Sequence, residues 1–301
     1  MRVATGPRAF KTYWLATRIS APLSTRLAGF FAERIWFTPW RVDPGERGRR
    51  RQREWLQDTQ PARFSTSHGP LVGFSAGRGP AILLVHGWGE RAASMGAFVE
   101  PLTGAGFRVV AIDLPGHGDS VSMRPNIYTI ADAIREVADA VGGLHGIVAH
   151  SLGGHSTMAA LRDGLDVPAV VLISPSSRAE HAVDRFTELL RLPGRAKAGL
   201  EAALERRFGR SIWDDLTGSN LIREVTTPAL IVHDRGDPQV AFDDSWHLSR
   251  AWRGARLMIT ESLGHGRILR DPRVLANSVS FLRGDPSSDT IRPKELEHAG
   301  G

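Results

Sequence analysis

The segment GIVAHSLGG, residues 146–154, decides the fold of this chain. A short apolar run leads through His150 into Ser151, and small residues, Ala149 and Gly153, stand two positions before and after the serine. A helical pattern follows. A strand that turns this sharply into a helix needs small residues at those positions, and the turn lifts the serine hydroxyl out of the sheet. The segment therefore predicts a nucleophilic serine at the carboxyl end of a buried strand.

Short apolar runs without polar alternation recur along the rest of the chain. They occupy residues 81–85 (AILLV), 109–112 (VVAI), 169–173 (AVVLI), 229–232 (ALIV) and 257–259 (LMI). Helical patterns separate them, most clearly at residues 130–141 and 272–282. Because strands of this kind are buried on both faces, the pattern predicts an α/β fold with a mainly parallel, doubly wound sheet. A short hairpin is expected before it, over residues 63–76.

The 301 residues divide into a main domain, expected over residues 61–283, and two flanking segments. Within the domain, residues 175–227 are too many for a simple crossover between strands, and they predict a short helical cap with helices such as 182–192 and 197–208. An insertion there lies over the carboxyl ends of the strands, where open α/β sheets bind ligands. Residues 284–301 are predicted to form a loose polar tail.

The first 60 residues are predicted to form an amphipathic helical and basic extension. Over residues 22–37, large apolar side chains recur at helical spacing and form a stripe that consists of Leu23, Leu27, Phe30, Phe31 and Ile35. We expect this stripe to pack on the main domain. The alternative is a peripheral membrane or partner contact through residues 22–53, which a basic, aromatic-rich amphipathic helix would suit. The basic stretch at residues 47–53 is expected to be a solvated linker or arm.

Composition excludes several classes of protein. The net charge is +6, but no nucleic-acid-binding motif is recognisable, so nucleic acid is not an expected partner. The chain has no cysteine, which excludes disulfides and thiolate chemistry. No run of apolar residues is long enough for a transmembrane helix, and charged residues interrupt the N-terminal region before a signal-peptide core could form. A cytoplasmic location is the expectation.

A carboxylate and a histidine follow later strands in an order that suits catalysis by Ser151. Asp237 lies shortly after the strand at 229–232, and His265 lies after the strand at 257–259. A serine hydroxyl needs a base within hydrogen-bonding reach, and that base needs a carboxylate to fix its tautomer. We therefore predict Ser151 as the nucleophile, His265 as the general base and Asp237 as the acid that orients it. The other carboxylates after the same strand are Asp234, Asp243 and Asp244.

A glycine-rich loop, HGWG at residues 86–89, follows the strand at 81–85. Such a loop can turn backbone N–H groups toward the serine, so the N–H groups of Trp88 and Leu152 are predicted to form an oxyanion hole. His86 is expected to brace this loop through hydrogen bonds. Asp113 and His117, in the segment DLPGHGDS, are expected to fix a neighbouring loop rather than to take part in catalysis.

Together, HGWG, DLPGHGDS, AHSLGG, HDRGD and the Gly-His pair at 264–265 resemble the α/β-hydrolase family, in particular its serine esterases and lipase-like enzymes with an HGWG oxyanion loop. The match departs from the usual G-x-S-x-G motif only at Ala149. The resemblance, over residues 63–283, implies a serine hydrolase that cleaves carboxylic esters or related acyl compounds through an acyl-serine intermediate.

What the resemblance implies about partners is limited to a small-molecule acyl substrate, with neither a metal nor an organic cofactor. Alternatives that keep the same triad are a haloperoxidase-like enzyme, an acyltransferase and a carbon–carbon hydrolase. A non-catalytic binding protein on the same fold is the alternative from another class.

Overall fold

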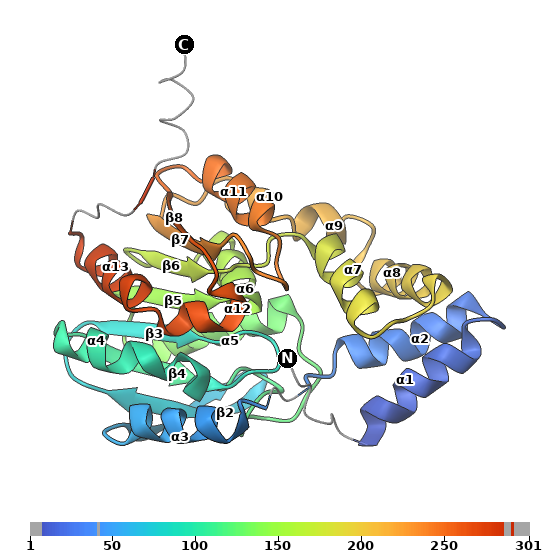
Figure 1. Cartoon of the computed structure of the whole chain (residues 1–301), viewed down its shortest axis with the longest axis horizontal. Helices are drawn as coiled ribbons and strands as arrows, with labels where there is room; N and C mark the ends of the chain where they lie inside the picture. Colours follow the sequence, from blue (N-terminus) through green and yellow to red (C-terminus); the bar gives the residue numbers. More distant parts are fainter. Residues whose placement is uncertain (1–7, 41–42, 286–289, 292–301) are drawn as a thin grey trace, which may run out of the picture.

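The computed structural model describes residues 8–40, 43–285 and 290–291, and its centre is an eight-stranded sheet (Figure 1). The strand order is β1-β2-β4-β3-β5-β6-β7-β8. The strands are β1 (Gln60–Thr66), β2 (Gly69–Ala76), β3 (Ala81–Val85), β4 (Arg108–Ile112), β5 (Gly146–His150), β6 (Val170–Ile173), β7 (Ala229–Asp234) and β8 (Arg256–Thr260). The β1–β2 and β2–β4 pairs are antiparallel, and every other neighbouring pair is parallel. The predicted fold class is confirmed.

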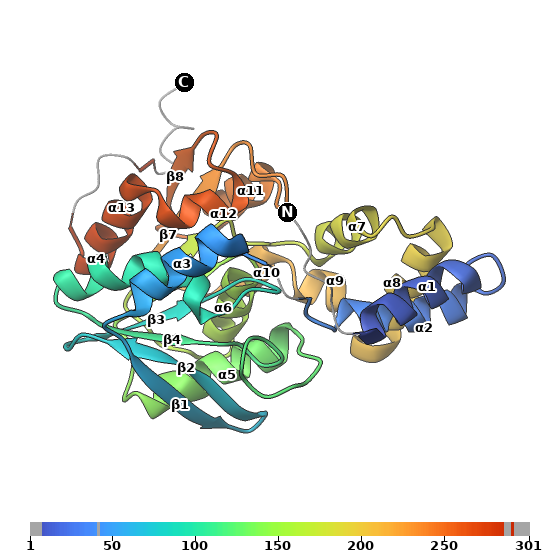
Figure 2. The same ribbon diagram turned by 60° about the horizontal axis from the view of Figure 1, so that its bottom comes forward.

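Helices cover both faces of the sheet (Figures 1 and 2). On one face lie α5 (Ile127–Ala140), α6 (Leu152–Arg162) and α11 (Phe242–Ala251). On the other face lie α3 (Gly45–Leu56), η1 (Ala92–Phe98), α4 (Val99–Gly104), α12 (Gly264–Arg267), η2 (Ile268–Arg270) and α13 (Pro272–Arg283). Successive strand residues point to opposite faces, so Leu83 packs with the first group of helices and Leu84 with the second. Both faces are therefore apolar, as continuous runs of buried residues require.

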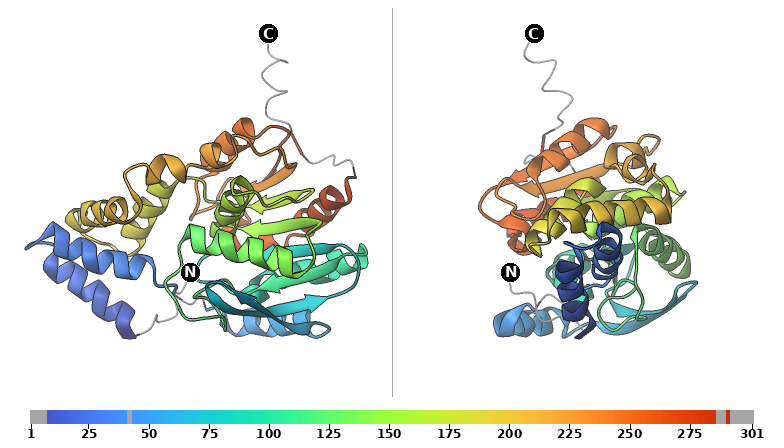
Figure 3. Two further views of the ribbon diagram at one scale, coloured as in Figure 1. Left: turned by 180° about the vertical axis from the view of Figure 1, so that it is seen from behind. Right: turned by 90° about the vertical axis from the view of Figure 1, so that its right-hand side faces the viewer.

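Four helices fill the interval that was predicted as a cap: α7 (Ala179–Leu189), α8 (Gly194–Phe208), α9 (Ile212–Asp215) and α10 (Gly218–Leu221). Two N-terminal helices, α1 (Arg8–Ser20) and α2 (Thr25–Trp36), form a hairpin that packs on α8 at the end of the molecule away from the sheet (Figures 1 and 3). The N-terminal segment thus packs on the cap, although it lies far from it in sequence.

The expectation that the stripe of large apolar residues packs on the main domain holds for only part of the stripe. Ile35 is fully buried, but Leu23 is 81% exposed and Phe30 is 44% exposed. Apart from Ile35, the buried residues of α2 are small, because the helix crosses α8 where Gly29 lies against Gly199. A Cβ atom on Gly29 would collide with the carbonyl group of Gly199. The two backbones come so close that only small residues fit between them.

The basic stretch at residues 47–53 is not a linker but most of helix α3. Arginine and glutamate favour helices, and Arg50 forms an ion pair with Glu54 one turn later, at 2.9 Å. No residue of α3 is fully buried, so the helix is solvated as expected. Trp55 holds it in place by packing over Gly96 in η1.

At the other end of the chain, Ile291 forms an isolated bridge with Leu257 through two backbone hydrogen bonds of 2.8 and 2.9 Å. This point of the predicted loose tail is therefore attached to β8, and most of the tail lies outside the described residues. Across the described ranges, the helices are too short or too polar to cross a bilayer.

Candidate active site

Ser151 occupies the sharp turn between β5 and α6 and has a backbone φ of 53° and ψ of −120°, a conformation that costs energy for any residue other than glycine. Its N–H donates to the carbonyl of Ile173 in the next strand at 3.0 Å. Gly153 is required here, since a Cβ atom would lie 2.5 Å from the carbonyl oxygen of His86. Ala149, which replaces the more usual glycine, is fully buried. The predicted strand–serine–helix turn is present.

His265 and Asp237 form a hydrogen-bonded pair on the loops that follow β8 and β7. The Nδ1 atom of His265 donates to Oδ2 of Asp237 at 2.7 Å. The other carboxylate oxygen, Oδ1, accepts from the backbone N–H groups of Gln239 at 2.8 Å and Val240 at 3.1 Å. Burial alone would raise the pKa of Asp237, but the hydrogen bond and charge of His265, together with the two backbone N–H bonds, outweigh burial and lower the pKa to about 2. The carboxylate is therefore ionised and held in one orientation.

Two of the alternative carboxylates have other partners. Asp234 accepts hydrogen bonds from Thr260 Oγ1 and Leu263 N, both at 2.9 Å, and so ties the end of β7 to the end of β8. Asp244 accepts from His181 of α7 at 2.9 Å. The third, Asp243, lies in the first turn of α11. Asp237 is the carboxylate that the structure brings to His265.

Glu90 and His150, which sequence reasoning did not single out, connect the parts of the site. His150 Nδ1 donates to Glu90 Oε2 at 3.1 Å, and its Nε2 donates to the backbone carbonyl of His265 at 3.0 Å. The same oxygen of Glu90 accepts from Gly87 N in the HGWG loop at 3.1 Å. One buried histidine thus holds together the serine turn, the HGWG loop and the His265 loop.

These groups also set the charge of the site. Burial lowers the pKa of His150, but the charge and hydrogen bond of Glu90, the carbonyl of His265 and the charge of Asp237 together outweigh burial, and the net shift is upward. Burial lowers the pKa of His265, and the positive charge of His150 lowers it further, although Asp237 opposes both. His265 is consequently neutral at neutral pH, the state in which a histidine can accept a proton.

The HGWG loop is braced by His86, as expected. His86 accepts a hydrogen bond from Leu114 N through Nε2, at 3.0 Å, so its Nδ1 carries the proton and donates to the Gly87 carbonyl at 2.8 Å. Burial lowers the pKa of His86 to about 4, and the ring stays neutral. For the backbone N–H groups of Trp88 and Leu152, no acceptor is found within the described part of the chain.

The neighbouring loop is fixed as predicted. The carboxylate of Asp113 accepts from the backbone N–H groups of Ala92 at 2.7 Å and Asp119 at 2.8 Å. His117 Nδ1 donates to the Pro115 carbonyl at 2.9 Å, and its ring meets the edge of Trp88. The hydrogen bonds of Asp113 and His117 go to backbone groups and not to Asp237 or His265, so both residues fix the conformation of the loop.

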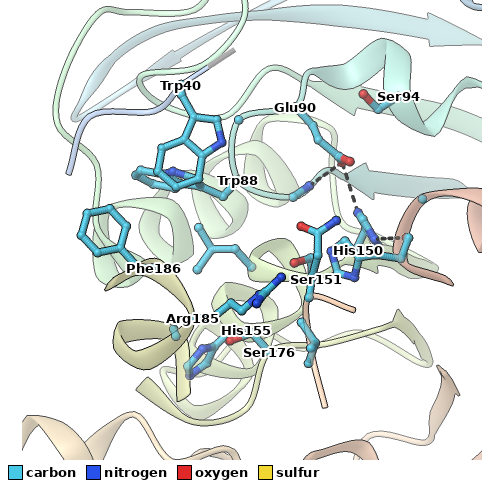
Figure 4. Close-up of a pocket in the computed structure, with 18 of the residues that line it drawn as sticks. Trp40, Trp88, Glu90, Ser94, His150, Ser151, His155, Ser176, Arg185 and Phe186 are labelled. Carbon is cyan, nitrogen blue, oxygen red and sulfur yellow. Dashed lines mark hydrogen bonds and ion pairs between the residues drawn. The ribbon is translucent and has the colours of Figure 1, made fainter. Parts of the chain in front are cut away.

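Ser151, Asp237 and His265 line one cavity of about 1560 Å³, which residues of the cap also line. Figure 4 shows Ser151 in this cavity, together with Trp40, Trp88 and Phe186. Its aromatic wall comes from distant parts of the sequence and includes Trp36, Phe37, Trp40, Trp88, Phe186 and Phe208. Trp40 stacks on Phe186 of α7 and meets the edge of Trp88. The N-terminal segment is thus part of the cavity wall, a role its sequence pattern did not reveal. In the described ranges, no three His, Asp or Glu side chains group together as a metal site.

A family model described as "Alpha/beta hydrolase family" matches residues 82–278, well over half of the chain. The chain is 27% identical over 233 residues to the pimeloyl-[acyl-carrier protein] methyl ester esterase of Neisseria meningitidis serogroup B, covering 65% of this chain and 89% of that protein. It is 44% identical to the Methylococcus capsulatus protein of the same name, but over only 63 residues, 24% of that protein.

Solved structures support the same fold. A bacterial membrane phospholipase A superposes with a TM-score of 0.61 at 22% identity, covering 78% of this chain and 89% of that one. An esterase from Exiguobacterium antarcticum also superposes with a TM-score of 0.61, at 17% identity, covering 74% of this chain and all of the other. With its mostly parallel sheet, its serine at the β5–α6 turn and this family match, the chain belongs to the α/β-hydrolase family.

Proposed function

We propose that this α/β hydrolase is a serine esterase that cleaves carboxylic esters through an acyl-serine intermediate. The observation that carries the proposal is the 2.7 Å hydrogen bond between His265 Nδ1 and Asp237 Oδ2, in the wall of the cavity that Ser151 also lines. The bond leaves Nε2 of His265 unprotonated and able to take a proton from a serine hydroxyl.

In the proposed reaction, Ser151 Oγ attacks the ester carbonyl while His265 Nε2 takes the hydroxyl proton. The resulting oxyanion accepts hydrogen bonds from the N–H groups of Trp88 and Leu152, both of which lack an acceptor within the described structure. The C–O bond to the alcohol then breaks, and His265 returns the proton to the leaving oxygen. A water molecule, deprotonated by His265, attacks the acyl-serine and releases the carboxylic acid and free Ser151.

The cavity wall favours an ester with a sizeable apolar part. Its aromatic lining and its volume suit a hydrocarbon chain or ring, and apolar cavities with a few polar groups are typical of small-molecule sites. The indole Nε1 of Trp40 is buried and has no hydrogen-bond partner among the described residues. A hydrogen-bond acceptor on the substrate would satisfy this group. The names of the Neisseria and Methylococcus relatives suggest methyl esters as one kind of substrate to test.

The test is a set of p-nitrophenyl esters of increasing acyl length, together with labelling by a fluorophosphonate probe. The wild-type protein should hydrolyse the esters and be labelled once, at Ser151. Ser151→Ala should lose both activities while its thermal midpoint stays close to that of the wild type, since loss of a nucleophile costs several orders of magnitude in rate. Ser94 also lines the cavity, so Ser94→Ala is the matched control and should keep both activities.

Labelling at a serine other than Ser151 would contradict the assignment. Labelling at Ser151 without hydrolysis of any ester would favour the other reactions of this triad: a haloperoxidase-like activity, acyl transfer or carbon–carbon hydrolysis. A folded protein that neither hydrolyses esters nor is labelled would favour a non-catalytic binding protein.

A further inference from the structure

The most exposed large apolar side chains of the described structure gather on the N-terminal helical hairpin. They are Leu15 at 52%, Ile19 at 62%, Leu23 at 81%, Leu27 at 45% and Phe30 at 44% exposure, which we call the hairpin patch. One further exposed side chain of this kind, Leu189, lies at the end of α7. The next residue, Leu190, accepts a hydrogen bond from Nε1 of Trp14 in α1 through its backbone carbonyl, at 2.9 Å. An apolar cluster of this size on the surface of a protein marks an interaction site.

The hairpin patch is not needed to hold the hairpin in place. The hairpin is fixed by the close crossing of α2 and α8 at Gly29 and Gly199 and by the fully buried Ala28 and Ala32. On each helix the exposed residues are three or four positions apart, as in Leu15 and Ile19, so they share one side of the helix. The hairpin projects from the end of the molecule opposite the sheet (Figures 1 and 3), where it can reach a flat surface.

Cations border the hairpin patch. Lys11, Arg18 and Arg26 are exposed on the same two helices. Arg195 adds a fourth positive charge at the turn, where its Nη1 donates to the carbonyl of Pro22 at 2.8 Å. The single acidic residue of α1 and α2, Glu33, is neutralised by an ion pair with Arg207 at 3.2 Å. The patch therefore presents apolar side chains inside a positively charged border.

We propose that the hairpin patch docks on an anionic phospholipid bilayer, with its apolar side chains in the headgroup–acyl boundary and its cations on the lipid phosphates. This combination of apolar and cationic side chains suits a negatively charged interface. A second copy of the chain fits less well, because a two-fold contact would bring the cationic patch of one copy against the same cationic patch of the other, without carboxylates to balance the charge. The α2 helix also supplies Trp36 to the cavity wall, so the docking surface and the cavity share one helix.

The test is cosedimentation of the full-length protein with vesicles of phosphatidylcholine, with and without phosphatidylglycerol. We expect binding to the anionic vesicles that weakens as salt rises, and little binding to the neutral ones. The double variant Leu23→Ser/Phe30→Ser should bind at least about tenfold more weakly, because it removes two of the large apolar contacts. Arg18→Gln/Arg26→Gln should also bind more weakly and show a weaker salt dependence, because it removes two of the four cations. Arg253→Gln, an exposed arginine on the main domain, is the control and should bind like the wild type.

Equal binding of the wild type and the Leu23→Ser/Phe30→Ser variant would overturn the proposal, as would a wild-type protein that ignores anionic vesicles. Light scattering provides the other outcome: a wild-type dimer that this double variant converts to a monomer would show that the patch is covered by a second copy. The readout does not depend on catalysis, so Ser151→Ala should bind vesicles as the wild type does. Failure of the esterase proposal would leave this one intact, and the reverse also holds.

Discussion

Replacing Asp237 with asparagine should separate the two roles that carboxylates have after β7. In the wild type, Oδ1 of Asp237 accepts two backbone N–H bonds, from Gln239 and Val240, while Oδ2 faces His265. An asparagine has one accepting oxygen, and the two backbone donors will hold it at the Oδ1 position. Its NH₂ group then points at Nδ1 of His265 and forces the proton of the imidazole onto Nε2.

In that tautomer Nε2 is a donor and cannot take the proton of Ser151. The expected loss in kcat is about 10⁴-fold. This is the size found when an amide replaces the carboxylate of a triad and leaves the histidine in the wrong tautomer. The two backbone bonds survive, so the free energy of unfolding should change little. The measurements are kcat on a short p-nitrophenyl ester and the thermal midpoint of the purified variant.

Asp234→Asn is the matched comparison, three residues earlier at the end of β7. Asp234 accepts from Gly236 N, Thr260 Oγ1 and Leu263 N, and an amide cannot satisfy all three donors. Loss of a hydrogen bond to a buried charged group should lower the free energy of unfolding by about 1.5–3 kcal/mol. Its kcat should stay within about tenfold of the wild type, because the pair of Asp237 and His265 is untouched. Equal losses of activity in the two variants, or a larger loss at Asp234, would refute this reasoning.

Three further predictions follow from the geometry. Ser151→Gly should be more stable than Ser151→Ala by about 1–2 kcal/mol, because glycine tolerates positive φ, and equal midpoints would mean that the turn is not strained. Gly29→Leu should force α2 away from α8 and lower the free energy of unfolding by at least about 1–3 kcal/mol. Gly194→Ala, which has open space around it, is the control and should cause no such loss. Calorimetry of both variants measures the difference. The acidic limb of the pH profile of kcat/KM should have its midpoint below the ordinary histidine pKa, because His265 must be neutral and its pKa is lowered. His150→Gln removes a positive charge that lowers this pKa, so it should move the limb to higher pH. An unmoved limb would count against the role of His150.

The core of the fold could be predicted from the sequence because each buried strand carries its own signal. Parallel strands covered on both faces must be apolar throughout, so the run AILLV at residues 81–85 coincides with β3. The turn at Ser151 likewise needs small residues at fixed positions, so a segment of nine residues is enough to predict it. Such local constraints also placed Asp237 and His265 at the ends of their strands.

The N-terminal segment could not be predicted in the same way, because its packing depends on a partner more than 160 residues away in sequence. Large apolar residues at helical spacing normally indicate the buried face of a helix, but two of these residues in α2, Leu27 and Phe30, are exposed. At the crossing with α8 the backbones approach so closely that Gly29 and Gly199 form the contact. Glycine and alanine are weak signals of burial, and nothing local in either helix indicates the other.

The link between Glu90 and His150 was missed for a similar reason. Each residue alone is ordinary: Glu90 follows a loop glycine, and His150 ends a strand. Their role in the site depends on three hydrogen bonds. Glu90 accepts from Gly87 N and from His150, and His150 also donates to the carbonyl of His265. A buried ion pair of this kind is costly unless its remaining bonds are satisfied, and here they are satisfied by the two loops that the site needs.

The structure therefore divides the proposed chemistry from the choice of substrate. Ser151 directly follows β5, and Asp237 and His265 lie in the segments that follow β7 and β8, where hydrogen bonds at the same edge of the sheet hold them. The aromatic wall above them is built by the cap and the N-terminal segment, where Trp40 stacks on Phe186. The crossing of α2 and α8 at Gly29 and Gly199 holds the N-terminal segment against the cap. The N-terminal segment, which lies outside the residues that match the family model, thus supplies part of the cavity wall.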